Sequence, residues 1–318
     1  MKLGVFTVLF ADRPFEAALD RIAEAGIDCV EIGTGNYPGD AHCDAATLLA
    51  DEGKLRAFRE AVTSRGLEIS ALSCHGNPLH PNRAVAQAAH DVFVLTVELA
   101  QRLEVGTVNL FSGCPGDSDE ALFPNWVTCA WPDDFAELLE WQWTRKVIPY
   151  WRDQSVFATE HDVRLGFEMH PGFVVHNPRT LLRLRDACGE AIGANLDPSH
   201  LFWQGINIEM AIAELGAARA IFHTHAKDTE LHPRNAGLNG VLDTVPMRDV
   251  ANRSWIFRTV GYGHSELDWR RILTAFRMAG YDGVLSIEHE DALLSIDEGF
   301  DKAVTFLRGV MPNEPATA

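Results

Sequence analysis

Metal-ligand side chains follow four apolar segments in the second half of the chain. These segments run into the motifs GFEMH, NLDPSH, FHTHAKD and SIEHED, which begin at residues 166, 195, 222 and 286. A charged group directly after a buried apolar run is unfavourable unless it is paired or binds a metal. One such carboxylate is readily explained as a loop ion pair, but four endings in succession indicate a shared site. The predicted metal ligands are Glu168, Asp197, His225 and Glu288.

Three carboxylates and one imidazole make an oxygen-rich ligand set for a single divalent metal. Such a set favours Mn²⁺ or Mg²⁺, of which we favour Mn²⁺, with Co²⁺ and Zn²⁺ as alternatives. A metal with open positions for two substrate oxygens polarises a carbonyl and stabilises an enediolate. Glu168 and Glu288 are therefore the candidate catalytic residues, each able to exchange a proton with the carbon beside that carbonyl.

Further polar and aromatic side chains near the same segment ends are candidates for contact with a substrate. His75 ends the third apolar segment and is equally consistent with a structural loop residue. His223 lies deeper than His225, and we interpret it as an interior histidine or one that supports the ligands. The predicted substrate-binding residues are His200, His75, His170, Lys227 and Trp203.

The elements that must position these residues alternate along the chain. Short apolar runs, such as residues 3–10, 163–169 and 192–196, alternate with longer segments whose apolar residues recur at helical spacing, such as residues 134–159 and 178–188. Eight such units in a chain longer than about 250 residues fit a closed barrel better than an open sheet. The sequence therefore predicts an α/β fold with a single (β/α)8 barrel domain over residues 1–311 and a flexible C-terminal tail over residues 312–318.

Two predicted connections are longer than a plain barrel requires. They cover residues 112–133 after strand four and residues 229–264 after strand seven, at the carboxyl ends where barrel active sites lie. We expect lids or substrate walls there, with surface decoration as the alternative. Their aromatic side chains predict that a glycoside is handled better than a free monosaccharide, unless they pack the loops or a subunit interface. These aromatics are Phe123, Trp126, Trp131, Trp255 and Phe257.

Composition narrows the class of partner. The formal net charge of −18 predicts an acidic surface, which disfavours nucleic acid and anionic membranes as partners. The sequence contains no apolar stretch of about 18 residues, the length that a spanning helix needs. The six cysteines lack CxxC spacing, so we expect free thiols rather than a disulfide framework and a reducing, cytoplasmic location.

The four motifs, together with GTGNYPGDAHC near the start and GYDGVLSIEHED near the end, resemble the xylose isomerase-like TIM barrel superfamily. The motifs near the start and the end are most similar to those of its sugar phosphate isomerase/epimerase branch. The resemblance covers essentially the whole chain. It implies a divalent-metal-dependent isomerase or epimerase of a sugar or keto-glycoside. Ketose 3-epimerases of this superfamily bind their metal through a Glu, an Asp, a His and a second Glu, and the two Glu form the acid/base pair. By motif, the four predicted ligands match them, and His200 matches a substrate-binding His.

One departure from that pattern concerns the substrate. The ketose 3-epimerases carry an Arg six residues after the metal His, and this sequence has Leu231 there, with Lys227 as a candidate replacement cation. Other relatives act on 3-keto-glycosides: some epimerise them, and others, as catalytic subunits of C-glycoside deglycosidases, eliminate the aglycone with the help of a small partner chain. The resemblance therefore leaves a lyase open beside an isomerase, and either a homo-oligomer or a complex with a small partner chain.

Two further classes compete with these enzymes. An endonuclease IV-like phosphodiesterase shares the barrel but needs several zinc ions and additional His ligands, whereas the fourth predicted strand here ends in Asn109-Leu110-Phe111-Ser112. A non-catalytic sugar-binding protein would not need a complete ligand set. Both are disfavoured, and the expected partner is a small carbohydrate or glycoside.

Overall fold

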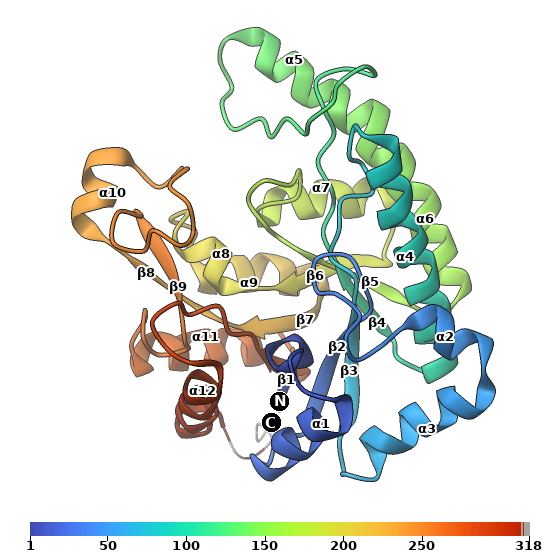
Figure 1. Ribbon diagram of the computed structural model, residues 1–318. Helices are drawn as coiled ribbons and strands as arrows, with labels where there is room; N and C mark the ends of the chain where they lie inside the picture. The colour runs from blue at the N-terminus through green and yellow to red at the C-terminus, as the bar shows by residue number, and fades with distance from the viewer. Residues whose placement is uncertain (313, 315–318) are drawn as a thin grey trace.

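Eight parallel strands close into a barrel, as the sequence predicts (Figure 1). Around the barrel the order is β1-β10-β7-β6-β5-β4-β3-β2, so each strand lies beside its neighbour in the chain once the insertion after β7 is set aside. The barrel strands are β1 (Lys2–Phe6), β2 (Cys29–Gly33), β3 (Glu68–Ser73), β4 (Thr107–Leu110), β5 (Arg164–Glu168), β6 (Ile192–Leu196), β7 (Ile221–Ala226) and β10 (Val284–Ile287). The computed structural model describes residues 1–312 and 314, and the predicted tail over residues 312–318 falls largely outside them.

Helices surround the barrel because their apolar faces cover the outside of the strands. Several begin at a side-chain cap, as where Asn177 and Thr180 form a capping box at the start of α7. The helices are α1 (Phe15–Glu24), α2 (Ala45–Ala50), α3 (Glu52–Thr63), α4 (Arg83–Leu103), α5 (Asp133–Gln142), α6 (Ile148–Glu160), α7 (Pro178–Cys188), α8 (Pro198–Phe202), α9 (Ile208–Ala217), α10 (Pro233–Asn239), α11 (Glu266–Met278) and α12 (Ile296–Val310).

Two predicted elements differ from the structure. The first strand was expected over residues 3–10, but it ends at Phe6 and continues as the 3₁₀ turn η1 (Thr7–Phe10). An apolar run does not by itself distinguish a strand from a helical turn. The long helix expected over residues 134–159 is divided by a π-helical turn, η2 (Trp143–Val147). Pro149 has no N–H to donate, so a regular α-helical hydrogen-bond ladder cannot run through that position.

Both predicted long connections are present. The chain between β4 and α5 has no helix or strand, and the chain after β7 forms an antiparallel ribbon, β8 (Asp228–Leu231) and β9 (Trp255–Arg258), with α10 between its strands. In Figure 1 this ribbon and α10 stand beside α8, apart from the barrel sheet. We call residues 228–264 the insertion.

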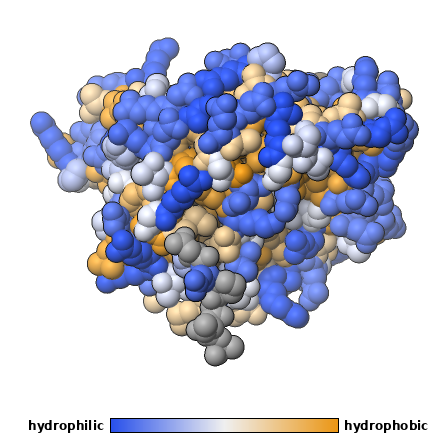
Figure 2. All heavy atoms as spheres, turned by 90° about the horizontal axis from the view of Figure 1, so that it is seen from below, coloured by the Kyte–Doolittle hydropathy of each residue, from blue (hydrophilic) through white to orange (hydrophobic). Residues whose placement is uncertain are grey.

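The outer surface is polar over much of its area, as the charge of −18 predicts. Seen from below, charged and polar side chains cover most of one face, with apolar residues exposed between them (Figure 2). None of the described helices is both long and apolar enough to cross a membrane. All six cysteines are free thiols, which confirms the prediction that they form no disulfide framework.

Asp228 anchors the base of the insertion. Its fully buried carboxylate accepts hydrogen bonds from the backbone N–H groups of Gly261, Gly263 and His264, at 3.0 to 3.2 Å. The indole of Trp269 and the ring of His264 also donate to it, at 3.2 and 2.6 Å. One side chain therefore ties the start of the insertion to its end.

We expect Asp228→Asn to lower the free energy of unfolding by about 3 kcal/mol, because an amide cannot replace both acceptor oxygens and leaves buried donors unpaired. Urea unfolding followed by circular dichroism measures the change. Asp153→Asn, at an exposed position of α6, is the matched control. Equal midpoints for the two variants would show that Asp228 does not anchor the insertion.

Candidate metal centre

Four predicted ligands converge at the carboxyl end of the barrel. Glu168 is the last residue of β5, Asp197 follows β6, His225 lies near the end of β7, and Glu288 follows β10. One ligand atom from each lies within 4.8 Å of the ligand atoms of the others. The strand alternation that buries their neighbours in the core directs these side chains into one mouth. The structure thus brings the complete predicted ligand set together.

The ligand atoms suit a divalent cation. His225 Nδ1 lies 3.0 Å from Glu288 Oε2, 3.5 Å from Glu168 Oε2 and 3.8 Å from Asp197 Oδ2. Although these atoms are close, His225 Nδ1 is buried without a partner in hydrogen-bond geometry, and Asp197 Oδ2 has only ion-pair contacts, at 3.1 Å to Lys227 Nζ and 3.4 Å to His200 Nε2. Buried polar atoms are rarely left in this state. Donor atoms that face one point without bonding to each other fit a metal between them.

Charge holds the two most buried carboxylates ionised. Burial alone raises the pKa of Glu168, but the contacts of His200 and His75 with its carboxylate outweigh burial and hold that pKa well below its usual range. Burial likewise opposes ionisation of Asp197, whose pKa the ammonium of Lys227 and the ring of His200 lower. Ionised carboxylates are the form that a metal requires.

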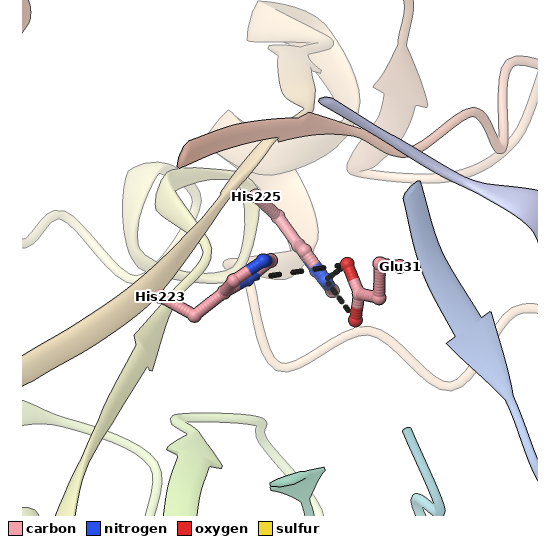
Figure 3. A group of neighbouring side chains, drawn as sticks. All are labelled: Glu31, His223 and His225. Carbon is pink, nitrogen blue, oxygen red and sulfur yellow. Dashed lines mark hydrogen bonds and ion pairs between the residues drawn. The ribbon is translucent and has the colours of Figure 1, made fainter. Parts of the chain in front are cut away.

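Glu31 is a functional residue that the sequence analysis missed. This carboxylate from β2 is fully buried beneath the ligands and lies 3.0 and 3.1 Å from His225 Nε2 (Figure 3). Its oxygens also accept hydrogen bonds from Ser73, Asn109 and Ser286, at 2.5 to 2.9 Å. A charged residue in the middle of the apolar run CVEIG was the signal that could have found it.

The contact with Glu31 decides which nitrogen of His225 is free. An ionised carboxylate only accepts hydrogen bonds. Burial raises the pKa of Glu31, but the rings of His225 and His223 and the hydroxyl of Ser73 hold that pKa below its usual range. Nε2 of His225 therefore carries hydrogen, and Nδ1 faces the other ligands. Carboxylates placed behind a metal-binding imidazole in this way fix its tautomer and orientation.

Glu31 and His223 do not make a second metal site with His225, although the three lie close together (Figure 3). His223 Nδ1 lies 3.1 Å from Asn195 Oδ1, and its Nε2 lies 3.2 Å from Ser70 Oγ. Burial lowers the pKa of His223 to about 4, so the ring is neutral and already paired. His223 is thus a hydrogen-bonded interior histidine that also lies 3.9 Å from Glu31, so both predicted alternatives fit its position.

Lys227 lies inside the ligand cluster. Its ammonium is buried at 2.7 Å from Glu288, 2.8 Å from Glu290 and 3.1 Å from Asp197. Burial opposes its charge, but these carboxylates raise its pKa well above the usual value. Its predicted contact with a substrate stays a prediction. Its observed contacts balance the charge of the ligand carboxylates.

The other predicted substrate-binding residues surround Glu168 or lie beyond it. His75 and His200 place Nε2 atoms 3.0 and 2.9 Å from the Glu168 carboxylate. The ring of His170 lies 4.0 Å from that of His200, whereas Trp203 is farther out and stacks on Trp255 at 4.5 Å. A cavity of about 320 Å³ opens over the ligands between β1, the loop after β2 and the loop after β10. A larger hollow of about 1330 Å³ lies on the outside between η2 and α7 and contains none of the predicted site residues.

We expect Glu31→Gln to weaken Mn²⁺ binding by about tenfold to a hundredfold, because the amide keeps the volume but releases the tautomer and orientation of His225. Isothermal titration calorimetry measures the affinity, and circular dichroism verifies the fold. Glu68→Gln, on an exposed position of β3, is the control. Equal Mn²⁺ affinity in the two variants would contradict a positioning role for Glu31.

Known proteins resemble this chain over nearly its whole length. The uncharacterized protein YfiH of Bacillus subtilis (strain 168) is 36% identical over 311 residues, which cover 97% of this chain and 98% of that protein. The structure is similar to that of the probable 3-DHS dehydratase AsbF from Bacillus anthracis, with a TM-score of 0.66, 16% identity and coverage of 97% and 99% of the two chains. It is also similar to D-psicose 3-epimerase from Clostridium cellulolyticum H10, with a TM-score of 0.61, 14% identity and coverage of 98% and 99%.

The sequence profile that describes the xylose isomerase-like TIM barrel matches residues 19–310, which includes seven of the eight barrel strands and all four predicted ligands. The resemblance predicted from the motifs is thereby confirmed, and the chain belongs to the xylose isomerase-like TIM barrel family.

Proposed function

We propose that this protein is a divalent-metal-dependent enzyme that isomerises or epimerises a sugar or keto-glycoside by removing a proton next to a carbonyl. The observation that carries the proposal is the convergence of Glu168, Asp197, His225 and Glu288 within 4.8 Å at the carboxyl end of the barrel. Family membership and the sugar epimerases among the similar structures support it. Mn²⁺ is the metal we propose.

The chain's own residues supply the proton transfers. Glu168, kept ionised by its histidine contacts, takes the proton as the C–H bond breaks, and the electron pair of that bond moves toward the carbonyl oxygen. The metal, when bound, supplies positive charge that stabilises the resulting enediolate. Glu288, protonated at the start of the cycle, delivers its proton to the other face of the same carbon, which inverts it and leaves Glu168 protonated and Glu288 ionised until both exchange protons with solvent. For isomerisation, Glu168 instead returns the proton to the former carbonyl carbon, and the proton of the neighbouring hydroxyl moves to the former carbonyl oxygen, so that a carbonyl forms at the first carbon.

Elimination of an aglycone from a 3-keto-glycoside begins with the same proton removal, so a lyase is the second candidate. The lyase is favoured by Leu231, which occupies the position where ketose 3-epimerases carry an Arg. Leu231 lies at the end of β8 and pairs with Trp255 in the insertion. A multi-zinc phosphodiesterase remains disfavoured. Asn109, at the end of β4, donates to Glu31 rather than offering a metal ligand.

We expect Glu168→Gln and Glu288→Gln each to lower proton exchange between substrate and D₂O by at least about a hundredfold, because the amides keep the volume but cannot act as a base. Metal-loaded protein is incubated with ketoses and with 3-keto-glycosides, and NMR follows the exchange. Glu209→Gln, exposed on α9, is the control. Elemental analysis of each variant separates loss of the base from loss of the metal. Near-normal exchange in either variant would make that glutamate a ligand only.

Metal content tests the centre independently of any substrate. Protein purified without chelator should contain roughly one equivalent of divalent metal, because the four ligands define one site. Treatment with EDTA should lower the melting temperature, and Mn²⁺ should restore it, since a ligand that binds only the folded state stabilises it. Several equivalents of zinc would support the phosphodiesterase, and no change with either reagent would argue for a non-catalytic protein.

A further inference from the structure

A second hollow of about 750 Å³ opens beside the metal centre. Glu290 lines both this hollow and the cavity over the ligands, and His200 lines the second hollow while its Nε2 contacts Glu168. The two spaces are therefore neighbours that share the side chain of Glu290 as a wall. A group attached to a molecule at the metal centre would extend into the second hollow, which we call the aromatic subsite.

Three separate segments of the chain supply the Trp and Phe rings of its wall. Trp126 comes from the loop after β4, Trp203 follows α8, and Trp255 and Phe257 lie on β9 of the insertion. Trp203 stacks on Trp255 with an interplanar angle of 8°, and Phe257 stands edge-on to His200 at 5.2 Å. Trp203, Trp255 and Phe257 form an apolar cluster of their own, outside the core of the barrel. Packing of the insertion thus accounts for part of the predicted aromatic set, but the same rings also face a hollow.

Unpaired donors in this wall point to a ligand. The indole Nε1 atoms of Trp126 and Trp203 are buried and have no hydrogen-bond partner, and Trp203 as a whole is only 5% exposed. Trp255, the third indole of the wall, is satisfied because it donates to the carbonyl of Val241 at 3.0 Å. Buried indole N–H groups normally find a partner. Both residues line the hollow, so a group bound there lies next to two indoles whose N–H groups have no protein partner.

The remaining wall selects for an uncharged, flat group. The segment over residues 242–247 adds Leu242, Val245, Pro246 and Met247 to the aromatic faces. Arg253 is buried, and its guanidinium donates to the backbone carbonyls of Trp255 and Val245. It therefore joins these two parts of the wall. Asp243 and Glu290 place negative charge at the hollow, which disfavours an anionic group.

We propose that the aromatic subsite binds an aryl group attached to the sugar at the metal centre, so that the substrate is an aryl keto-glycoside whose ring carries acceptor oxygens. This inference rests on the proposed function for the position of the sugar. A second sugar ring also offers an apolar face and acceptor oxygens. It carries many hydroxyls that need partners, however, and the wall is mainly apolar. The aryl group is therefore the better fit.

The test measures binding rather than turnover. Isothermal titration calorimetry of Mn²⁺-loaded protein compares methyl β-D-glucoside, 4-methoxyphenyl β-D-glucoside and the disaccharide cellobiose. We expect the aryl glycoside to bind at least about tenfold more tightly than the methyl glycoside, because a ring is buried. Equal affinity for these two would overturn the subsite, and tighter binding of cellobiose would overturn its assignment to an aryl group.

Variants locate the effect. Trp203→Phe and Trp126→Phe keep an aromatic face but remove the unpaired N–H, and we expect each to weaken aryl glycoside binding by about threefold to tenfold while the affinity for methyl β-D-glucoside stays unchanged. Trp141→Phe, on α5 and outside the hollow, is the control. Equal effects of all three variants would overturn the proposal. If no sugar exchanged protons with solvent but the aryl glycoside still bound more tightly than the methyl glycoside, the proposed function would be wrong and the aromatic subsite would remain supported.

Discussion

The burial of several carboxylates at one end of the barrel is the constraint on which the rest of the site depends. Glu31, Glu168 and Asp197 are each at most 3% exposed, and buried like charges lose hydration and repel one another. Lys227, equally buried, lies among them and offsets part of this charge. With Glu288 and Glu290 included, the carboxylates still outnumber this cation. A divalent cation is the natural counterion for the remaining negative charge, and the ligand atoms that lack hydrogen-bond partners lie where it would bind.

Closure of the barrel makes this arrangement possible. Glu31 lies on β2 and His225 on β7, and β1 and β10 separate these strands in the sheet. Their side chains meet because both point into the barrel, so the carboxylate reaches the ring from across the interior. Ser73 on β3, Asn109 on β4 and Ser286 on β10 complete the shell around Glu31. The hydrogen bonds that hold Glu31 against the His225 imidazole are therefore also contacts between strands that barrel closure brings together.

The barrel and its ligand set could be predicted because both follow from local patterns. Apolar periodicity marks the strands, and a polar residue at each strand end reaches the mouth whatever the details of packing, which is why Glu168, Asp197, His225 and Glu288 were identified. The role of Glu31 could not be predicted in the same way, since its partners come from four other strands and depend on register and closure. The local pattern also gave a wrong prediction for η1, where a mostly buried apolar run forms a 3₁₀ turn instead of continuing the strand. The stacking of Trp203 on Trp255 joins segments that only the folded insertion brings together.

The insertion is joined to the carboxyl end of the barrel, where the four predicted ligands lie, so its position affects the surroundings of these ligands. β7 supplies His225, the next residues supply Lys227, and Asp228 begins β8 while fixing the far end of the insertion at residues 261–264. From β9, Phe257 places its ring 4.6 Å from the Lys227 ammonium and 5.2 Å from the ring of His200. A change in the insertion therefore alters the surroundings of both a cation that contacts two ligands and a histidine that contacts a third. Specificity can thus vary through this segment while the four ligands keep their places on the strands, as expected for a barrel whose loops carry its function.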